Sequence, residues 1–121
     1  MKMIRAVRGA TTLDADTREQ MLERTGELVR EVLDRNAIEH ADVVSVVFTA
    51  TPDIRSEFPA AAARTVGISH VPLLCARELD VEGAVPLCVR ALFHVYTERA
   101  PEDLRHVYVH GARMLRLDLP Q

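Results

Sequence analysis

The chain has 121 residues, of which 48% are hydrophobic and 27% are charged, a composition typical of one globular domain. Its formal net charge of −3 argues against a nucleic-acid-binding surface, which needs a basic surplus on one face. Aromatic residues are scarce, with three Phe, two Tyr and no Trp, so aliphatic side chains must build the core. We expect residues 1–121 to form a single domain, and a domain this small gains stability by oligomerising.

Cysteine usage and hydropathy predict a soluble, reduced, cytoplasmic protein. Cys75 and Cys88 make neither a disulfide framework nor a metal motif, because no further Cys or His lies at zinc-ligand spacing from either. The N-terminus lacks the apolar core of a signal peptide, and no apolar run is long enough to span a bilayer. Arginine far outnumbers lysine, but genomic base composition explains that bias as well as function does.

The chain begins with a predicted strand and a long helix. Residues 3–9 mix apolar and basic side chains and predict a strand that Gly9 ends, with residues 11–12 in a loop. Residues 17–20 match a helix capping box. Apolar side chains then recur at helical spacing, which predicts an amphipathic helix ending near Asn36.

The middle of the chain predicts a buried strand and a short helix. Residues 42–50 are dense in β-branched side chains, as a buried strand requires. A turn at residues 52–53 follows. Residues 60–66 are rich in alanine and lie between Pro59 and Gly67, which is the punctuation expected of a helix start and end.

The C-terminal part predicts a strand, a second main helix and a hairpin. Residues 70–75 predict a short strand, and apolar side chains at helical spacing over residues 85–96 predict a helix. Residues 106–110 and 113–117 alternate around Gly111 and predict two paired strands. The whole order predicts a single α+β domain with a mixed β-sheet covered by helices.

Few side chains suit nucleophilic or metal chemistry. No Ser lies in a nucleophile elbow, and residues 9–12 lack the glycine spacing and lysine of a phosphate-binding loop. Cys75, five residues after His70, is a candidate nucleophile, although a packed strand residue is the better interpretation. His106 and His110 alternate onto one strand face, and a hydrogen-bonded or surface role outweighs a metal site there. We expect neither metal nor cofactor.

What remains is a set of arginines and hydrogen-bonding groups at the ends of elements. Arg8 ends the first strand, Glu78 lies in a connector, and Tyr108 lies in an otherwise apolar strand. A single arginine is normally a solvated surface charge. Arg90 differs, because its apolar neighbours in the predicted second helix imply partial burial, and a buried arginine needs an anionic partner.

Several short motifs occur in order along almost the whole chain. They are Ile4–Thr12, Ala50–Asp53, Phe58–Ala60 with Arg64, Val71-Pro72, Cys75, Glu78–Val81, Cys88–Arg90, Arg105–Tyr108 and Leu115–Leu119. In this combination the chain resembles the trimeric α+β class of monofunctional chorismate mutase, as distinct from the all-helical class. Each motif alone is weak, but their order and spacing together are specific.

The resemblance implies an enzyme that converts chorismate into prephenate, the branch step towards phenylalanine and tyrosine. It implies a [3,3] rearrangement without cofactor, metal or covalent intermediate. It also implies a homotrimer, built as a pseudo-α/β-barrel, with active sites at the subunit interfaces.

The resemblance also implies a role for each matching residue. Arg8 and Arg90 would hold a substrate carboxylate and the ether oxygen, and Tyr108 would donate a hydrogen bond to a carboxylate. Glu78 would accept a hydrogen bond from the ring hydroxyl, with Cys75 nearby. The other implied site residues are Phe58, Ala60, Leu73, Leu74 and Leu115 as pocket lining, and Arg64 and Arg116 at the rim, with Phe58 and Arg64 serving a neighbouring subunit.

The chain departs from the family pattern at the predicted pocket entrance. Ala61 replaces a frequent lysine, Leu74 replaces a small polar residue, one residue is missing between Arg64 and Val71, and the chain ends soon after the last motif. We expect these departures to weaken substrate capture before they affect the chemistry.

Two other functions stay open at this point. One is a non-catalytic, trimeric small-anion-binding or regulatory domain on the same fold, against which the joint retention of Arg8, Glu78, Arg90 and Tyr108 counts. The other is an enzyme of another class, such as an imine-hydrolysing trimer, which does not explain the spacing from Cys75 to Glu78.

Overall fold

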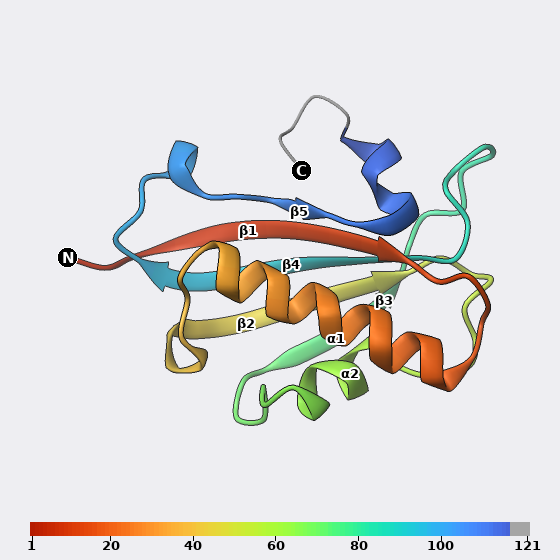
Figure 1. Ribbon diagram of the computed structural model, residues 1–121, viewed down its shortest axis with the longest axis horizontal. Helices are drawn as coiled ribbons and strands as arrows, with labels where there is room; N and C mark the ends of the chain where they lie inside the picture. Colours follow the sequence, from red (N-terminus) through yellow and green to blue (C-terminus); the bar gives the residue numbers. More distant parts are fainter. Residues whose placement is uncertain (117–121) are drawn as a thin grey trace.

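The computed structural model describes residues 1–116, which form a five-stranded mixed sheet with helices (Figure 1). The elements in chain order are β1 (Met3–Thr12), α1 (Arg18–Arg35), η1 (His40–Asp42), β2 (Val43–Ala50), α2 (Pro59–Thr65), β3 (Leu73–Arg77), β4 (Cys88–Thr97), η2 (Pro101–Asp103), β5 (Val107–Tyr108) and η3 (His110–Leu115). The strand order is β3-β2-β4-β1-β5, and β4 runs antiparallel to both of its neighbours. The α+β class with a mixed sheet is confirmed.

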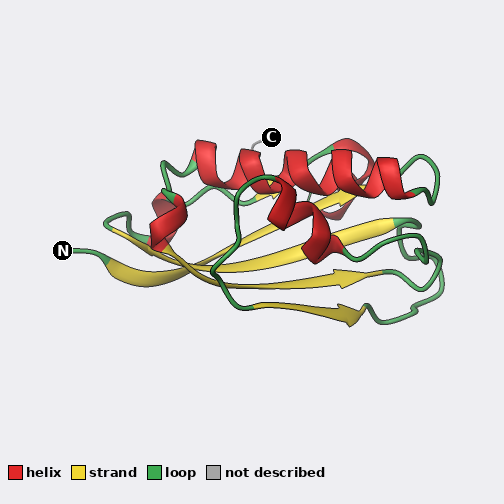
Figure 2. Ribbon diagram, turned by 90° about the horizontal axis from the view of Figure 1, so that it is seen from below, coloured by secondary structure: helices red, strands yellow, loops and turns green. Residues whose placement is uncertain are grey.

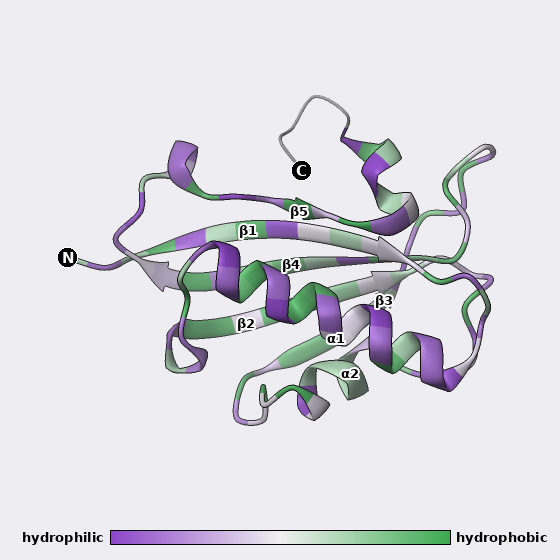
Figure 3. Ribbon diagram, in the orientation of Figure 1, coloured by the Kyte–Doolittle hydropathy of each residue, from purple (hydrophilic) through white to green (hydrophobic). Residues whose placement is uncertain are grey.

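Both α-helices cover the same face of the sheet, and the opposite face carries no α-helix (Figure 2). On β4 the alternate side chains Val89, Ala91, Phe93 and Val95 are buried against the helices. The strands behind α1 are correspondingly rich in hydrophobic residues (Figure 3). The core therefore lies between α1, α2 and one face of the sheet. The other residues of β4 point to the opposite face, the bare face, which no α-helix covers.

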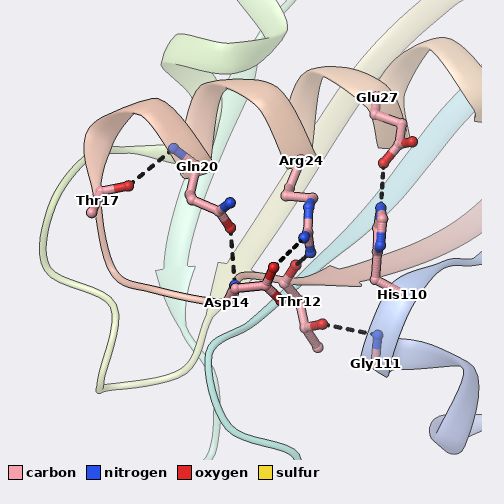
Figure 4. Close-up of polar contacts among 8 residues, drawn as sticks. All are labelled: Thr12, Asp14, Thr17, Gln20, Arg24, Glu27, His110 and Gly111. Atoms are coloured by element: carbon pink, nitrogen blue, oxygen red, sulfur yellow. Dashed lines mark hydrogen bonds and ion pairs between the residues drawn. The ribbon is translucent and has the colours of Figure 1, made fainter.

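The predicted long helix is α1, and its N-terminus is only half of a capping box. The Thr17 hydroxyl accepts a hydrogen bond from the Gln20 backbone N–H at 3.2 Å. The Gln20 side chain does not return to Thr17; it accepts from the Asp14 N–H at 2.9 Å (Figure 4). At the other end, Asn36 hydrogen-bonds the backbone of Arg105 in both directions and ties α1 to the segment before β5.

The predicted buried strand and short helix are also confirmed, as β2 and α2. Pro59 is the first residue of α2, where its missing N–H costs nothing. Gly67 follows the helix with a φ of 98°, in the left-handed region that favours glycine.

The predicted end of the first strand at Gly9 was wrong, because β1 continues to Thr12. Gly9 lies within the sheet, paired with Ala91 on one side and Val107 on the other. A Cβ there would lie 3.0 Å from Leu28 Cδ1 and 3.2 Å from the Val107 carbonyl oxygen. Glycine is thus required for close packing of α1 on the sheet and does not mark a turn.

The predicted helix over residues 85–96 was wrong, because Cys88–Thr97 form β4, the middle strand of the sheet. Its apolar residues fit a helical spacing by coincidence, since the face that points away from the helices carries Cys88, Leu92 and Tyr96 as well as the polar Arg90 and His94. The alternation of buried and partly exposed side chains over Val89–Val95 is that of a strand. Arg90 therefore lies on a strand and not on a helix, although its predicted partial burial is confirmed.

Two further strand predictions were inaccurate. The strand predicted at residues 70–75 is β3, shifted to Leu73–Arg77. The predicted hairpin is only the two-residue β5, followed by the 3₁₀ helix η3 over His110–Leu115. Residue 117, the end of the predicted second hairpin strand, lies outside the described residues.

Candidate active site

A row of polar side chains crosses the bare face of the sheet. The strand registers place Tyr108 opposite Ala10, Ala10 opposite Arg90, and Arg90 opposite Thr49. Directly paired residues point to the same face, and neighbouring strands lie about 4.8 Å apart. Ala10 contributes only a methyl group between the two larger side chains. Tyr108 and Arg90 thus reach the same face from two strands, β5 and β4, that β1 separates in the sheet.

Glu78 joins this row immediately after β3. The Thr49 hydroxyl donates to Glu78 Oε1 at 2.9 Å, and the Glu78 backbone N–H donates to the Ala50 carbonyl at 3.0 Å. Arg90 Nε lies 3.2 Å from the same Oε1. The anionic partner expected for Arg90 is therefore Glu78.

The Arg90–Glu78 pair leaves a donor unused. Arg90 Nε is buried, and although it forms an ion pair with Glu78, this N–H has no hydrogen-bond partner among the described residues. A buried unpaired donor is costly, and a bound acceptor would satisfy it. The site thus presents a fixed cation with spare hydrogen-bonding capacity.

Tyr108 has the same property. Its side chain is buried, and the hydroxyl has no hydrogen-bond partner within residues 1–116. It packs in a small cluster with Ala10, Cys88 and Ala112, which Leu115 of η3 contacts. The predicted pocket residue Leu115 therefore lies beside Tyr108.

Cys88 also belongs to this face, two residues before Arg90 on β4. Burial raises the pKa of the Cys88 thiol above 9.0, and the neighbouring Arg90 guanidinium only partly opposes this effect. A neutral thiol leaves the positive charge of Arg90 uncompensated on that side. The sequence alone predicts no role for the Cys88 and Thr49 side chains. Strand alternation around Arg90 indicates Cys88, but only the β2–β4 register identifies Thr49.

Arg8 lies one row away on β1, paired with Leu92 of β4, and its side chain is exposed on the bare face. The Arg8 backbone N–H donates to His106 Nδ1 at 3.0 Å. Burial lowers the pKa of His106 below 6.5, and the positive charges of Arg8 and Arg116 lower it further. Arg8 and the predicted rim residue Arg116 therefore act on the same imidazole.

A second group of predicted site residues lies elsewhere, around a pocket of about 540 Å³ at one end of the sheet. Cys75 and Phe58 line this pocket together with Arg55 and Arg77, two arginines that the sequence analysis did not single out. Neither guanidinium has an ion-pair partner in the described part of the chain. The pocket combines an exposed aromatic ring with two cations.

The register separates this second group from the first. Cys75 pairs with Phe48, whose side chain is in the core, so Cys75 points to the helix-covered face, as does Leu73. Ala60 and Arg64 lie on α2, the first buried and the second exposed. One chain therefore does not bring these four residues to Arg90.

Leu74 is the exception within β3. It pairs with Val47 of β2, in the same row as Arg8, so it points to the bare face. It lies on the opposite edge of the sheet from Arg8, and its side chain is 63% exposed.

Helix α1 and strand β1 fix the start of η3 (Figure 4). His110 Nε2 lies 2.7 Å from Glu27 Oε1 on α1, and the Gly111 N–H donates to the Thr12 hydroxyl at 2.9 Å. His110 and His106 thus have separate partners. Residues 1–116 contain no group of three His, Cys, Asp or Glu side chains that could hold a metal ion.

Comparison with known proteins identifies the class to which this sheet and this row of side chains belong. Residues 4–119 match the family model for chorismate mutase type I. The chain belongs to this family. None of its described helices is long and apolar enough to cross a membrane.

Individual relatives agree over nearly the full length. The chain is 40% identical to the chorismate mutase AroH of Bacillus subtilis (strain 168) over 118 residues, covering 97% of this chain and 93% of the relative. It is 42% identical to the chorismate mutase AroH of Thermus thermophilus, covering 97% of each. A solved chorismate mutase from Clostridium thermocellum superposes with a TM-score of 0.89 at 38% identity, covering 91% of this chain and 98% of that one.

Proposed function

We propose that residues 1–121 form one chorismate mutase domain whose catalytic groups are Arg90, Arg8 and Glu78. Membership of the family makes the chain an isomerase that converts chorismate into prephenate, in the biosynthesis of phenylalanine and tyrosine. The observation that carries the residue assignment is the row on the bare face. In it, two buried donors, Arg90 Nε and the Tyr108 hydroxyl, lack hydrogen-bond partners in the described chain.

The reaction is an intramolecular [3,3] rearrangement in which one C–O bond breaks as a C–C bond forms. The substrate must be held in a compact, chair-like conformer, which is a positioning task. Negative charge grows on the ether oxygen as the C–O bond stretches. The Arg90 guanidinium, already fixed by Glu78, stabilises that charge more in the transition state than in the ground state.

The remaining groups of the bare face hold the two ends of the substrate. Arg8 binds a carboxylate, since an arginine offers a rigid fork of donors to a carboxylate. The Tyr108 hydroxyl donates to a carboxylate in the same way. Glu78, held by Thr49, accepts a hydrogen bond from the ring hydroxyl. Leu115 lines the pocket beside Tyr108, and Arg116 lies at the rim.

Phe58, Ala60, Arg64, Leu73 and Cys75 complete the site from a neighbouring subunit of a homotrimer, and Leu74 lines the pocket from the bare face. In support, the structure holds two sets of candidate residues on different surfaces of one chain. A contact between two different surfaces is heterologous, and a heterologous contact that closes makes a ring. Three sheets with bare faces turned inward and helices outward would form the pseudo-α/β-barrel.

The enzyme works in the cytoplasm in this proposal. Its two cysteines, Cys75 and Cys88, are both free, which suits a reducing compartment. Free thiols near an arginine-lined site stay reduced there without further protection.

The experiment is a spectroscopic assay with purified protein and chorismate. The wild-type protein is expected to consume the substrate's diene absorbance faster than the uncatalysed reaction does. The Arg90→Ala protein should consume it little faster than the uncatalysed reaction. An inactive, folded and trimeric wild-type protein would favour an anion-binding domain instead. A fully active Arg90→Ala protein would leave the activity intact but overturn the assignment of the row.

A further inference from the structure

Strand β5 pairs with only two residues of β1, and a side chain accepts the backbone N–H of the residue before them. The parallel ladder holds only two pairs, Gly9 with Val107 and Ala10 with Tyr108. At the preceding position the Arg8 N–H has no backbone acceptor on β5. It donates instead to Nδ1 of His106 at 3.0 Å. The His106 imidazole therefore takes the place of a backbone carbonyl in the ladder. It does so beside Arg8 and Tyr108, two of the proposed substrate-binding residues.

The contact fixes the charge and the tautomer of His106. A ring nitrogen that accepts a hydrogen bond carries no proton, so Nδ1 is bare and the neutral ring carries its proton on Nε2. The charged groups acting on the ring are the Arg8 guanidinium of β1 and the Arg116 guanidinium beyond η3, both positive. The ring is half-buried as well, so the surroundings favour the neutral form.

We propose that neutral His106 is a positioning residue for chorismate binding, which holds the Arg8 segment of β1 by accepting its N–H. This inference rests on the proposed role of Arg8. Protonation of Nδ1 would turn the acceptor into a donor facing the Arg8 N–H and break the contact. The Arg8 side chain would then lose its fixed approach to the substrate carboxylate.

This mechanism makes a prediction opposite to that of simple electrostatics. A protonated His106 adds a third positive charge beside Arg8 and Arg116, which by attraction alone would lower KM for a dianion in acid. Loss of the Arg8 contact raises KM instead. The folded protein also disfavours the protonated ring, so the stability contributed by His106 is complete above pH 6.5 and declines as the pH falls below that value.

The test compares His106→Asn and His106→Ala with the wild type, measuring kcat and KM for chorismate from about pH 5 to about pH 8, where histidine titrates. Asparagine keeps an acceptor near the position of Nδ1 but does not titrate. We expect the wild-type KM to rise as the pH falls, and the His106→Asn KM to stay nearly constant. His106→Ala should raise KM about tenfold at neutral pH, because it leaves the Arg8 N–H unpaired, and His106→Asn should recover most of that loss.

A matched control is His70→Asn, an exposed histidine that should keep the wild-type pH profile. A His106→Asn protein with the wild-type rise in KM overturns the proposal, and so does a KM that falls in acid. If His106→Ala does not fold, the pH profile of His106→Asn still decides. Failure of the underlying assignment is separate, because it would appear as wild-type kinetics in Arg8→Ala.

Discussion

Arg90 and Tyr108 show how a residue acquires a function from its backbone pairing. Tyr108 is buried and Arg90 is partly buried, and each has a buried donor atom without a hydrogen-bond partner among the described residues, an arrangement that costs stability in the free chain. Such a cost is typical of a site whose missing partner is a ligand. The same two residues at exposed positions would be ordinary surface groups.

The first prediction concerns Arg90→Lys. Lysine keeps the positive charge but loses the planar fork and the Nε donor, so transition-state stabilisation falls while the fold persists. We expect kcat to fall by about 10²–10³-fold, as for removal of a preorganised donor, with little change in the melting temperature.

Arg30→Lys on the exposed side of α1 is the matched control, and its kinetics should equal those of the wild type. Near-normal turnover in Arg90→Lys would show that charge alone is enough at this position.

At the scale of the element, β1 is decisive because it contacts β4, β5, α1 and η3. It pairs with β4 over its whole length and with β5 at its C-terminal end, and it packs beneath α1. Its side chains alternate between the core, where Val7 and Gly9 lie, and the bare face, where Arg8 and Ala10 lie. A distortion of β1 therefore affects both the core and the site.

The second prediction is that Gly9→Ala destabilises the fold. The new methyl group would lie 3.0 Å from Leu28 Cδ1 and 3.2 Å from each of two further neighbours, one of them the backbone oxygen of Val107. We expect the free energy of unfolding in urea to fall by about 1–3 kcal/mol, as for overpacking of a core.

The control is Gly26→Ala in the middle of α1. Its added methyl group meets one tight contact, Val66 Cγ1 at 3.3 Å, and gains helix propensity of about 1 kcal/mol. A smaller loss is expected for this variant, or a gain. Equal stability of Gly9→Ala and wild type would mean that α1 shifts away from the sheet at no cost.

At the scale of the whole molecule, the bare face of the sheet exposes hydrophobic side chains that nothing in one subunit covers in the described residues. Ile4, Leu74 and Tyr96 are large hydrophobic residues that are about half exposed or more, and the strand registers place all three on this face. Exposed apolar surface of this kind indicates an interface. In the proposed trimer this interface also unites the two sets of site residues.

The third prediction follows from that division. Arg90→Ala and Arg64→Ala proteins are each expected to be impaired, one in each half of the site. If the subunits are unfolded together, mixed in equal amounts and refolded, about a quarter of the interfaces of a closed ring should carry two intact halves. The mixture should therefore recover about a quarter of the wild-type activity.

A mixture that stays as impaired as its components would place both arginines in a site within one chain. Size-exclusion chromatography of the mixture, compared with the wild type, checks that the oligomer has formed in both cases.

The sequence alone determined the parts of this protein that depend on local patterns. The cap at Thr17 and the helical spacing after it predict α1, the β-branched residues of 43–50 predict β2, and Pro59 with Gly67 delimits α2. The motifs, taken together, also indicated the family. Each of these helices and strands is encoded within a few residues, so no long-range contact is needed to predict it.

Only the tertiary structure decided which side chains meet. An apolar run such as 88–97 fits a helix as well as a central strand, because Cys88, Leu92 and Tyr96 on the bare face interrupt the polar alternation that would distinguish the two. Gly9 suggested a strand end because its real constraint, the approach of α1, comes from residues far along the chain. The register of five strands then set Arg90 between Thr49 and Ala10, and set Cys75 on the other face, because each one-residue step along a strand reverses the face.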